Sequence, residues 1–332
     1  MSGATFTALL VEQTEPKTFT RSIVQRHLED LPEGELLVSV EYSSLNYKDA
    51  LSATGHPGVS RKFPHTPGID AAGEVIEDAS GTFTAGDPVI LTGFDLGMNT
   101  PGGLGQRVRV PANWALPLPT GLSLRESMAL GTAGLTAGLC VQRLLDAGVT
   151  ANSGDILVTG ATGGVGSLAV GILARAGFRP VAASGKLEAA AFLRELGATD
   201  TISREDVLAG AEKPMMRERW AGVVDVVGGD MLAAAIKATH YGGAVTCCGL
   251  VGSAELNLNV YPFILRGVSL HGIDSVQCPL AKRQEVWDKL AGPWKLQNLD
   301  ETVTEIGLDG VEEKIMDLLQ GKVTGRTLVN LV

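Results

Sequence analysis

The chain is poor in several residue types that mark particular functions. Aromatic residues make up 5% of its 332 residues, and cysteine occurs four times. The 27 Lys and Arg residues are outnumbered by 37 Asp and Glu residues, so the formal net charge is −10 and no basic cluster stands out. A nucleic-acid-binding protein needs concentrated positive charge to neutralise phosphates. The composition therefore predicts no nucleic-acid partner.

Long apolar runs and cysteine pairs are also scarce. No run approaches the length that spans a bilayer, and the N-terminal MSGATFTALL lacks the basic start and long apolar core of a secretory signal. We therefore predict a cytoplasmic protein with no membrane partner. No C-x-x-C pair occurs, which favours free thiols packed as small hydrophobic side chains over a disulfide or a metal site. The cysteines are Cys140, Cys247, Cys248 and Cys278.

Glycine and apolar residues, in contrast, are plentiful. The chain has 42 glycines, 45% hydrophobic residues and 19% charged residues, a profile that suits a packed α/β enzyme and argues against disorder. Its length exceeds what one core usually organises, so we expect two domains.

The most informative segment is 155–166, DILVTGATGGVG. An apolar strand, a glycine turn and an apolar helical segment follow one another, which is the context of a dinucleotide site. A helix N-terminus offers a pyrophosphate its backbone N–H groups and positive dipole. A side chain at Gly163 or Gly164 would block that approach, and one at Gly166 would push the helix off the sheet. The alternative is a tight turn that binds nothing. The predicted cofactor contacts are Thr162, Gly163, Gly164 and Val165.

The pattern of strands and helices divides the chain. Residues 127–278 alternate apolar strands with helices, which predicts a doubly wound parallel sheet of the Rossmann type. Residues 1–126 contain short strands separated by glycine and proline, which is typical of an antiparallel β domain with one solvent-exposed face. Residues 279–332 hold two amphipathic helices and a last strand that can return to the first domain. We therefore predict an α/β fold in which 127–278 is inserted between 1–126 and 279–332.

The residues after the second Rossmann strand predict the choice of nicotinamide cofactor. NAD-binding domains place an acid there to accept from the ribose hydroxyls. This chain has Ser184-Gly185-Lys186 instead, and a hydroxyl, a backbone N–H and an ammonium suit a 2′-phosphate. We predict NADPH as the cofactor, with Arg204 as a further phosphate contact. The alternatives are a surface lysine at the start of a helix and a solvated arginine.

Several spaced motifs are similar to those of a known family. Together they resemble the medium-chain dehydrogenase/reductase superfamily over nearly the whole chain, which implies that the first domain is GroES-like. The motifs are LNYKDAL (45–51), PGIDAAGEV (67–75), ALGTAGLTA (129–137) and GATGGVG (160–166). A further set resembles the acrylyl-CoA reductase branch, which is often described loosely as quinone oxidoreductase. This set is SSLNYKDAL (43–51), SGK (184–186), GIDSV (272–276) and VTGRTLV (323–329).

The same resemblance implies a site without zinc. Zinc-dependent members carry Cys where this chain has Asn46 or Tyr47, and Gly-His-Glu where it has 68–70, Gly-Ile-Asp. Zinc needs three or four converging N, S or O donors, which this pattern does not offer. His56 and His65 are expected to be loop histidines.

Without a metal, the chemistry that the resemblance implies is hydride addition to an activated C=C bond. We expect NADPH-dependent reduction of a short 2-enoyl-CoA, acryloyl-CoA to propanoyl-CoA, by a homodimer. The alternatives are a reductase of quinones or free alkenals, and an NADPH-binding protein without chemistry.

The resemblance also assigns residues to the reaction. It implies that Asn46, Tyr47 and Asp49 lie at the nicotinamide end of the substrate cleft, where Asn46 orients the substrate and Tyr47 contacts the cofactor or donates a proton. Asp70 takes the position of the lost zinc ligand, and Arg326 reaches the site and the cofactor, unless the two form a structural pair.

Each of these residues has a plainer alternative. Tyr47 can be a core tyrosine, Asn46 a turn residue and Asp49 an acid at a helix N-terminus. The remaining implied cofactor contacts are Thr136, Leu250 and Ser275, with helix packing as the alternative for Thr136.

Overall fold

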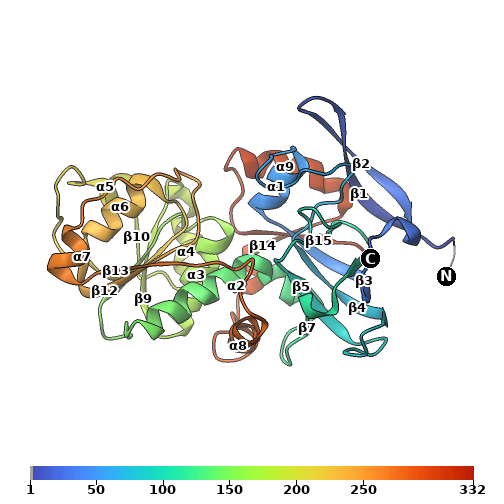
Figure 1. Ribbon diagram of the computed structural model, residues 1–332. Helices are drawn as coiled ribbons and strands as arrows, with labels where there is room; N and C mark the ends of the chain where they lie inside the picture. The colour runs from blue at the N-terminus through green and yellow to red at the C-terminus, as the bar shows by residue number, and fades with distance from the viewer. Residues whose placement is uncertain (1–2) are drawn as a thin grey trace. The chain divides into compact units, whose positions relative to one another are not determined.

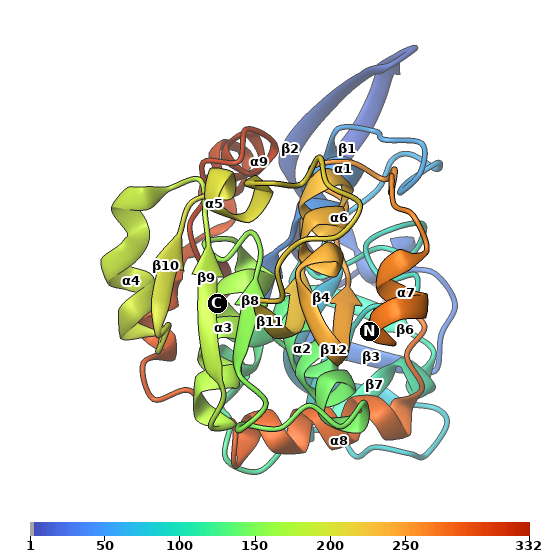
Figure 2. The ribbon, with the colours of Figure 1, turned by 90° about the vertical axis from the view of Figure 1, so that its left-hand side faces the viewer.

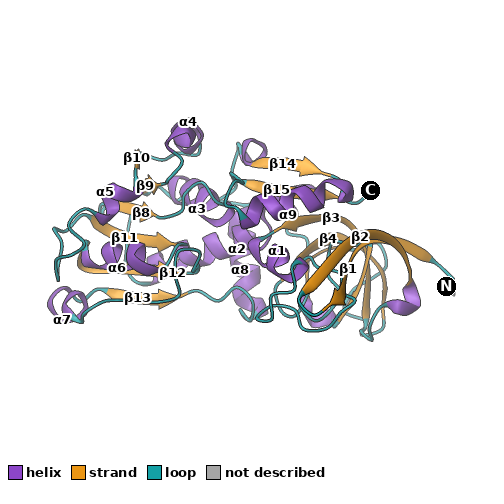
Figure 3. Ribbon diagram, turned by 90° about the horizontal axis from the view of Figure 1, so that it is seen from above, coloured by secondary structure: helices purple, strands orange, loops and turns teal. Residues whose placement is uncertain are grey.

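The computed structural model describes residues 3–332, apart from the side chain of Leu187. The chain divides into two compact units (Figure 1). Unit 1 comprises Met1–Thr132, Val276–Glu285 and Leu299–Val332, and unit 2 comprises Ala133–Ser275 and Val286–Asn298. The fold is α/β, as predicted, and strand dominates unit 1 whereas strands and helices alternate in unit 2 (Figure 3).

Unit 1 is built on a seven-stranded, mainly antiparallel sheet in the order β14-β15-β3-β4-β5-β7, with β6 also paired to β3. Buried and less buried residues alternate along β6, as expected for a sheet with one face on the core. The strands are β3 Leu36–Leu45, β4 Asp70–Asp78, β5 Pro88–Thr92, β6 Arg107–Val110, β7 Ala115–Pro117, β14 Val303–Ile306 and β15 Arg326–Asn330. A separate hairpin joins β1 Thr5–Glu15 and β2 Thr18–His27, and the helices are α1 Tyr47–Ala53 and α9 Val311–Leu319.

Unit 2 contains a six-stranded parallel sheet in the order β10-β9-β8-β11-β12-β13. Figure 2 shows β10, β9, β8, β11 and β12 lying side by side in this order. The order reverses between β8 and β11, and open sheets of this kind bind ligands at such a switch point. The strands are β8 Asp155–Val158, β9 Arg179–Ala183, β10 Asp200–Ile202, β11 Trp220–Asp225, β12 Thr239–Cys247 and β13 Ser269–Gly272. The helices are α3 Gly164–Arg175, α4 Ala190–Glu195, α5 Arg204–Leu208, α6 Gly229–Lys237 and α7 Tyr261–Arg266.

Two helices continue from one unit into the other. They are α2 Leu124–Asp146, which leaves helical geometry at Gly131, and α8 Leu280–Ala291. We predicted that all of 279–332 belongs with the first domain, but the structure groups Val286–Asn298 with unit 2. Val286 packs closely against unit 2, since a Cβ on Gly138 would lie 2.5 Å from Val286 Cγ1.

Helix α2 is long and apolar enough to span a membrane by length and composition, which differs from the expectation that no segment approaches this length. Of its most apolar window, 83% is buried inside the folded chain. The packing of the protein itself therefore accounts for the apolar surface of this helix.

Candidate dinucleotide site and candidate active site

The turn between β8 and α3 has the geometry that a dinucleotide site requires. Gly163 is the N-cap residue of α3, so the helix N-terminus points out of the turn. A Cβ on Gly166 would lie 2.3 Å from the carbonyl oxygen of Gly160, so this position needs glycine for the helix to pack on the turn. A Cβ on Gly163 would meet the same oxygen only at 3.4 Å, an ordinary contact. Protein atoms therefore crowd Gly166 but leave room at Gly163, where an anion would approach.

The predicted phosphate-binding residues lie together after β9. The backbone N–H of Lys186 donates to Ser184 Oγ at 2.9 Å, and Thr162 Oγ1 lies 3.2 Å from the same oxygen. The Lys186 N–H thus organises the turn around Ser184. A Cβ on Gly185 would lie 2.9 Å from Nε of Arg204, so the guanidinium rests against this glycine.

The start of α5 explains why Arg204 is placed there. Ser203 is the N-cap residue: its hydroxyl accepts from the Asp206 N–H at 3.1 Å, and the Asp206 carboxylate accepts from the Ser203 N–H at 2.9 Å. This capping box fixes Arg204 as the first helical residue. Burial lowers the pKa of Lys186, Arg204 lowers it further, and Glu188 opposes the shift. The Arg204 guanidinium thus lies against Gly185 and close enough to Lys186 to affect its pKa, and two neighbouring cations suit an anionic ligand.

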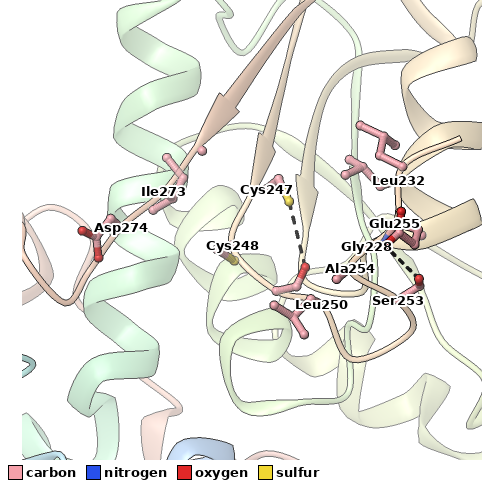
Figure 4. A pocket seen from close by; sticks show the side chains of 14 residues that line it. Gly228, Leu232, Cys247, Cys248, Leu250, Ser253, Ala254, Glu255, Ile273 and Asp274 are labelled. Atoms are coloured by element: carbon pink, nitrogen blue, oxygen red, sulfur yellow. Dashed lines mark hydrogen bonds between the residues drawn. The ribbon is translucent and has the colours of Figure 1, made fainter. Parts of the chain in front are cut away.

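A pocket of about 550 Å³ lies in unit 2 beyond the carboxyl ends of β11, β12 and β13 (Figure 4). Leu250, a predicted cofactor contact, lines it. Sequence reasoning missed the other lining residues, although the segments that follow parallel strands are where such folds bind ligands. They include Gly228, Cys247, Cys248, Ser253 and Asp274.

Hydrogen bonds shape the edge of this region. Asp225, at the end of β11, accepts from Thr159 Oγ1 at 2.7 Å and from the Gly228 N–H at 2.8 Å, and so holds the turn that lines the pocket. The hydroxyl of Thr136 donates to Ser275 Oγ at 2.8 Å. The structure thus brings together two of the predicted cofactor contacts, Thr136 and Ser275, just after β13.

In unit 1, the start of α1 contains the three residues that the resemblance places at the nicotinamide end of the cleft, Asn46, Tyr47 and Asp49. Asn46 is the N-cap residue, and its N–H donates to Asp49 Oδ2 at 2.7 Å. Asp49 Oδ1 accepts from the Ile69 N–H at 2.8 Å. Asp49 is therefore the helix N-terminal acid that we gave as its alternative. Tyr47 is 42% exposed, so it is not the core tyrosine that we gave as its alternative.

Asp70 is the centre of a buried hydrogen-bond network. Its carboxylate accepts from Ser44 Oγ at 2.7 Å, from Asn46 Nδ2 at 2.7 Å and from Thr132 Oγ1 at 2.6 Å. The Thr132 N–H adds bonds of 2.9 and 3.0 Å. A Cβ on Gly131 would lie 2.5 Å from Asp70 Oδ2, so the departure of α2 from helical geometry lets its backbone approach the carboxylate.

Arg326 completes this network from β15. Its Nη2 donates to Ser44 Oγ at 2.8 Å and lies 3.8 Å from Asp70 Oδ2, and its Nη1 donates to Asn46 Oδ1 at 3.2 Å. The two side chains therefore form the structural pair that we considered as their alternative. Both partners hold the amide of Asn46, the residue that precedes the exposed Tyr47.

The charges of the network perturb each other. Burial and the neighbouring carboxylate of Asp70 raise the pKa of Asp49 to about 7. Burial lowers the pKa of Arg326, while Asp70 and Asp49 act in the opposite direction. The Arg326 guanidinium thus pairs with Asp70, while Asp49 acts on both side chains through its charge.

Comparison with known proteins agrees with this architecture. Residues 32–120 match the alcohol dehydrogenase GroES-like domain, and residues 164–292 match the zinc-binding dehydrogenase domain. A Ruegeria pomeroyi protein named acrylyl-CoA reductase AcuI is 44% identical over 98% of this chain and 99% of its own length. The yhdH oxidoreductase of Salmonella enterica, solved in complex with NADP, is 42% identical with a TM-score of 0.95, covering 98% of this chain and all of that one.

A third relative carries a different name. The putative quinone oxidoreductase YhfP of Bacillus subtilis is 45% identical over 91% of this chain and 92% of its own length. Its structure, solved with NAD bound, has a TM-score of 0.96 and 43% identity over 99% of this chain and all of that one. This chain therefore belongs to the medium-chain dehydrogenase/reductase superfamily of oxidoreductases, in the branch that the acrylyl-CoA reductase and quinone oxidoreductase relatives share.

The zinc in the name of the matched domain does not fit the residues present. At the expected ligand positions lie the Asn46 amide, the Tyr47 phenol and the Asp70 carboxylate. That carboxylate accepts three side-chain hydrogen bonds and faces a guanidinium at 3.8 Å, which disfavours a divalent cation. Within residues 3–332, no three His, Cys, Asp or Glu side chains are grouped to hold a metal ion.

Proposed function

We propose that this chain is an NADPH-dependent reductase of a short 2-enoyl-CoA and converts acryloyl-CoA to propanoyl-CoA. The observation that carries the cofactor assignment is the Arg204 guanidinium against Gly185, next to Lys186 in the chain, where the adenosine 2′-phosphate of NADPH would bind. The complex of the Salmonella relative with NADP supports it. The name of the Ruegeria relative supports the substrate.

The residues of unit 2 would bind each part of the cofactor: the pyrophosphate, the 2′-phosphate and the nicotinamide half. The N-terminus of α3, with Thr162, Gly163, Gly164 and Val165, would hold the pyrophosphate. Ser184, Gly185, Lys186 and Arg204 would hold the 2′-phosphate, and the pocket with Leu250 would receive the nicotinamide half beside Thr136 and Ser275. When bound, NADPH supplies a hydride.

The residues of unit 1 would serve the substrate. Reduction of an enoyl thioester needs a donor for the carbonyl oxygen, on which charge builds, and a proton for the α-carbon. Tyr47, which is 42% exposed, would supply the proton from its hydroxyl, and it also remains a candidate cofactor contact. Asn46 would orient the substrate, because Asp70 and Arg326 fix its amide. Asp70 and Arg326, both buried, would be positioning residues.

The substrate is tested by comparing steady-state kcat/KM for acryloyl-CoA, methyl vinyl ketone and a benzoquinone, each with NADPH. We expect acryloyl-CoA to be reduced with a much higher kcat/KM, because binding of the remote nucleotide handle positions the short acyl group. The quinone oxidoreductase name of the Bacillus relative supports the second candidate, a quinone or alkenal reductase. Equal kcat/KM for the thioester and the free enone would favour that candidate, and NADPH binding without turnover would leave only a binding protein.

We further propose a cytoplasmic homodimer that pairs through the β13 edge of unit 2. Among the described strands, β13 ends the sheet and pairs with β12 alone. The adjacent α7 exposes Ile264 by 72% and Leu265 by 61%, which is unusual for large apolar side chains. Sedimentation equilibrium should find a dimer that Ile264→Asp converts to monomer. A monomeric wild-type protein would refute this arrangement.

A further inference from the structure

A buried arginine outside the proposed active site donates hydrogen bonds to the segment where the chain re-enters unit 1. Arg283, on α8, is 1% exposed. Its Nη1 donates to the carbonyl of Thr92, the last residue of β5, at 2.6 Å, and its Nη2 donates to the carbonyl of Val276 at 2.6 Å. Its Nε donates to the carbonyl of Cys278 at 2.8 Å. One guanidinium thus holds Val276 and Cys278, where the chain re-enters unit 1, against the end of β5.

A strained residue lies under this guanidinium. Phe94 has a φ of +53°, a left-handed conformation that is rare for a bulky side chain and costs free energy. Its ring lies 4.4 Å below the Arg283 guanidinium and is stacked on Trp114 at 5.4 Å. The backbone N–H that this conformation turns outward donates to the carbonyl of Val276 at 2.9 Å. The strained backbone conformation of Phe94 therefore goes together with a hydrogen bond from its N–H to the Val276 carbonyl.

Val276 receives both donors on a single carbonyl oxygen. It is the first residue of unit 1 after the chain leaves unit 2, and it directly follows Ser275. The preceding residue, Ser275, accepts a hydrogen bond from the Thr136 hydroxyl, and Asp274 before it lines the pocket. The residue that follows the predicted cofactor contact Ser275 is thus held by Arg283 and Phe94.

We propose that Arg283 is a positioning residue for cofactor binding, and that it acts with Phe94 by fixing the Val276 carbonyl and thereby Ser275. This inference rests on the proposed NADPH function. Lysine cannot replace Arg283, because one ammonium does not reproduce a planar fork that bridges Thr92 and Val276.

The test compares Arg283→Lys with Arg266→Lys. Arg266 is the matched control, since it also donates to backbone carbonyls (Met216, Lys237 and Thr239) but at the opposite ends of the strands. The NADPH Kd is measured by fluorescence well below the Tm of both variants, and amide hydrogen exchange is measured without cofactor. We expect Arg283→Lys to raise the NADPH Kd about tenfold, because that factor corresponds to the loss of one charge-assisted hydrogen bond. The same substitution should increase the hydrogen-exchange rate of the Phe94 amide. Arg266→Lys should lower Tm without changing either readout.

Two further variants protect the test against misfolding. Glycine tolerates the φ of residue 94, so Phe94→Gly should fold and still raise the NADPH Kd several-fold, about fivefold, because the support for Arg283 is lost. Phe94→Tyr keeps the ring and should retain the wild-type Kd. If Arg283→Lys and Phe94→Gly bind NADPH like the wild type, Arg283 has only a structural role. If the wild type itself does not bind NADPH, the proposed function fails instead.

Discussion

Asp70 Oδ2 lies 3.8 Å from Arg326 Nη2, and the two side chains are 0% and 3% exposed. Both also hold the amide of Asn46. A buried ion pair is expensive to break, because removal of one partner leaves the other as an uncompensated buried charge. In this protein the pair therefore couples the stability of unit 1 to the orientation of Asn46.

Replacement of Arg326 by Met should destabilise the protein by about 3–5 kcal/mol, measured by urea unfolding, because the charge of Asp70 is then left unpaired. The control is Arg179→Met, which breaks the exposed Arg179–Asp155 pair and should shift the unfolding midpoint far less. Equal shifts for the two variants would show that burial of the Asp70–Arg326 pair has no energetic weight.

The substitution Gly131→Ala should reduce stability by about 1–3 kcal/mol, because the new Cβ would meet Asp70 Oδ2 at 2.5 Å at a φ of +53°. Gly148→Ala provides the comparison, since its φ is +85° but nothing lies within 4 Å of its Cβ. The difference in Tm between the two variants isolates the clash. Should Gly148→Ala be just as destabilised, backbone strain alone would explain the effect.

Lys186→Ala should raise the KM for NADPH about tenfold or more and leave the KM for NADH nearly unchanged, because a charge-assisted contact to the 2′-phosphate is lost. Steady-state kinetics with both cofactors provide the measurement. A wild-type enzyme that prefers NADH over NADPH would contradict the assignment. This outcome is a fair test, because the Bacillus relative was solved with NAD bound.

Tyr47→Phe removes one hydroxyl and keeps the ring. We expect a lower kcat with little change in Tm, because the side chain is exposed and its hydroxyl is assigned to proton donation. Thermal unfolding and kcat are compared for the same preparations. A fully active variant would remove the hydroxyl from the mechanism.

Asp49 should contribute a pH dependence to stability. Its pKa is about 7 when folded against 3.8 for an ordinary Asp, so the folded protein binds more protons than the unfolded chain between these values. The free energy of unfolding therefore falls as pH rises from about 4 through 7. Asp49→Asn should flatten this slope, measured as the difference between the unfolding curves of variant and wild type. Parallel pH profiles would mean that Asp49 titrates normally despite Asp70 and Arg326 beside it.

Local patterns were sufficient to predict the two kinds of sheet and the glycine turn. The 155–166 segment carries its strand, turn and helix within a few residues of each other, and the requirement for glycine at Gly166 follows from that short range. The grouping of Ser184, Gly185 and Lys186 was equally accessible, since neighbours in the chain must be neighbours in space.

Contacts between distant segments were not accessible in the same way. Asp70 and Arg326 were predicted both as catalytic residues and as a structural pair, and the pairing of β15 and β4 with β3 between them brings the two side chains together. Residues 286–298 were predicted to belong to the first domain, because the pattern of an amphipathic helix does not indicate which hydrophobic core its apolar face packs against. Arg283 was not singled out, because an arginine on such a helix is normally solvated.

The α/β class, the antiparallel and parallel domains and the dinucleotide turn could be predicted from the residues alone, because hydrophobic period and glycine spacing act over short stretches of chain. Which charged side chains are buried, and which groups they bind, became visible in the folded chain, where Asp70 accepts from Thr132 and Asn46 and Arg283 donates to Val276. The physical reason is that the cost of burying a charge depends on partners supplied by strands and helices far away in the sequence.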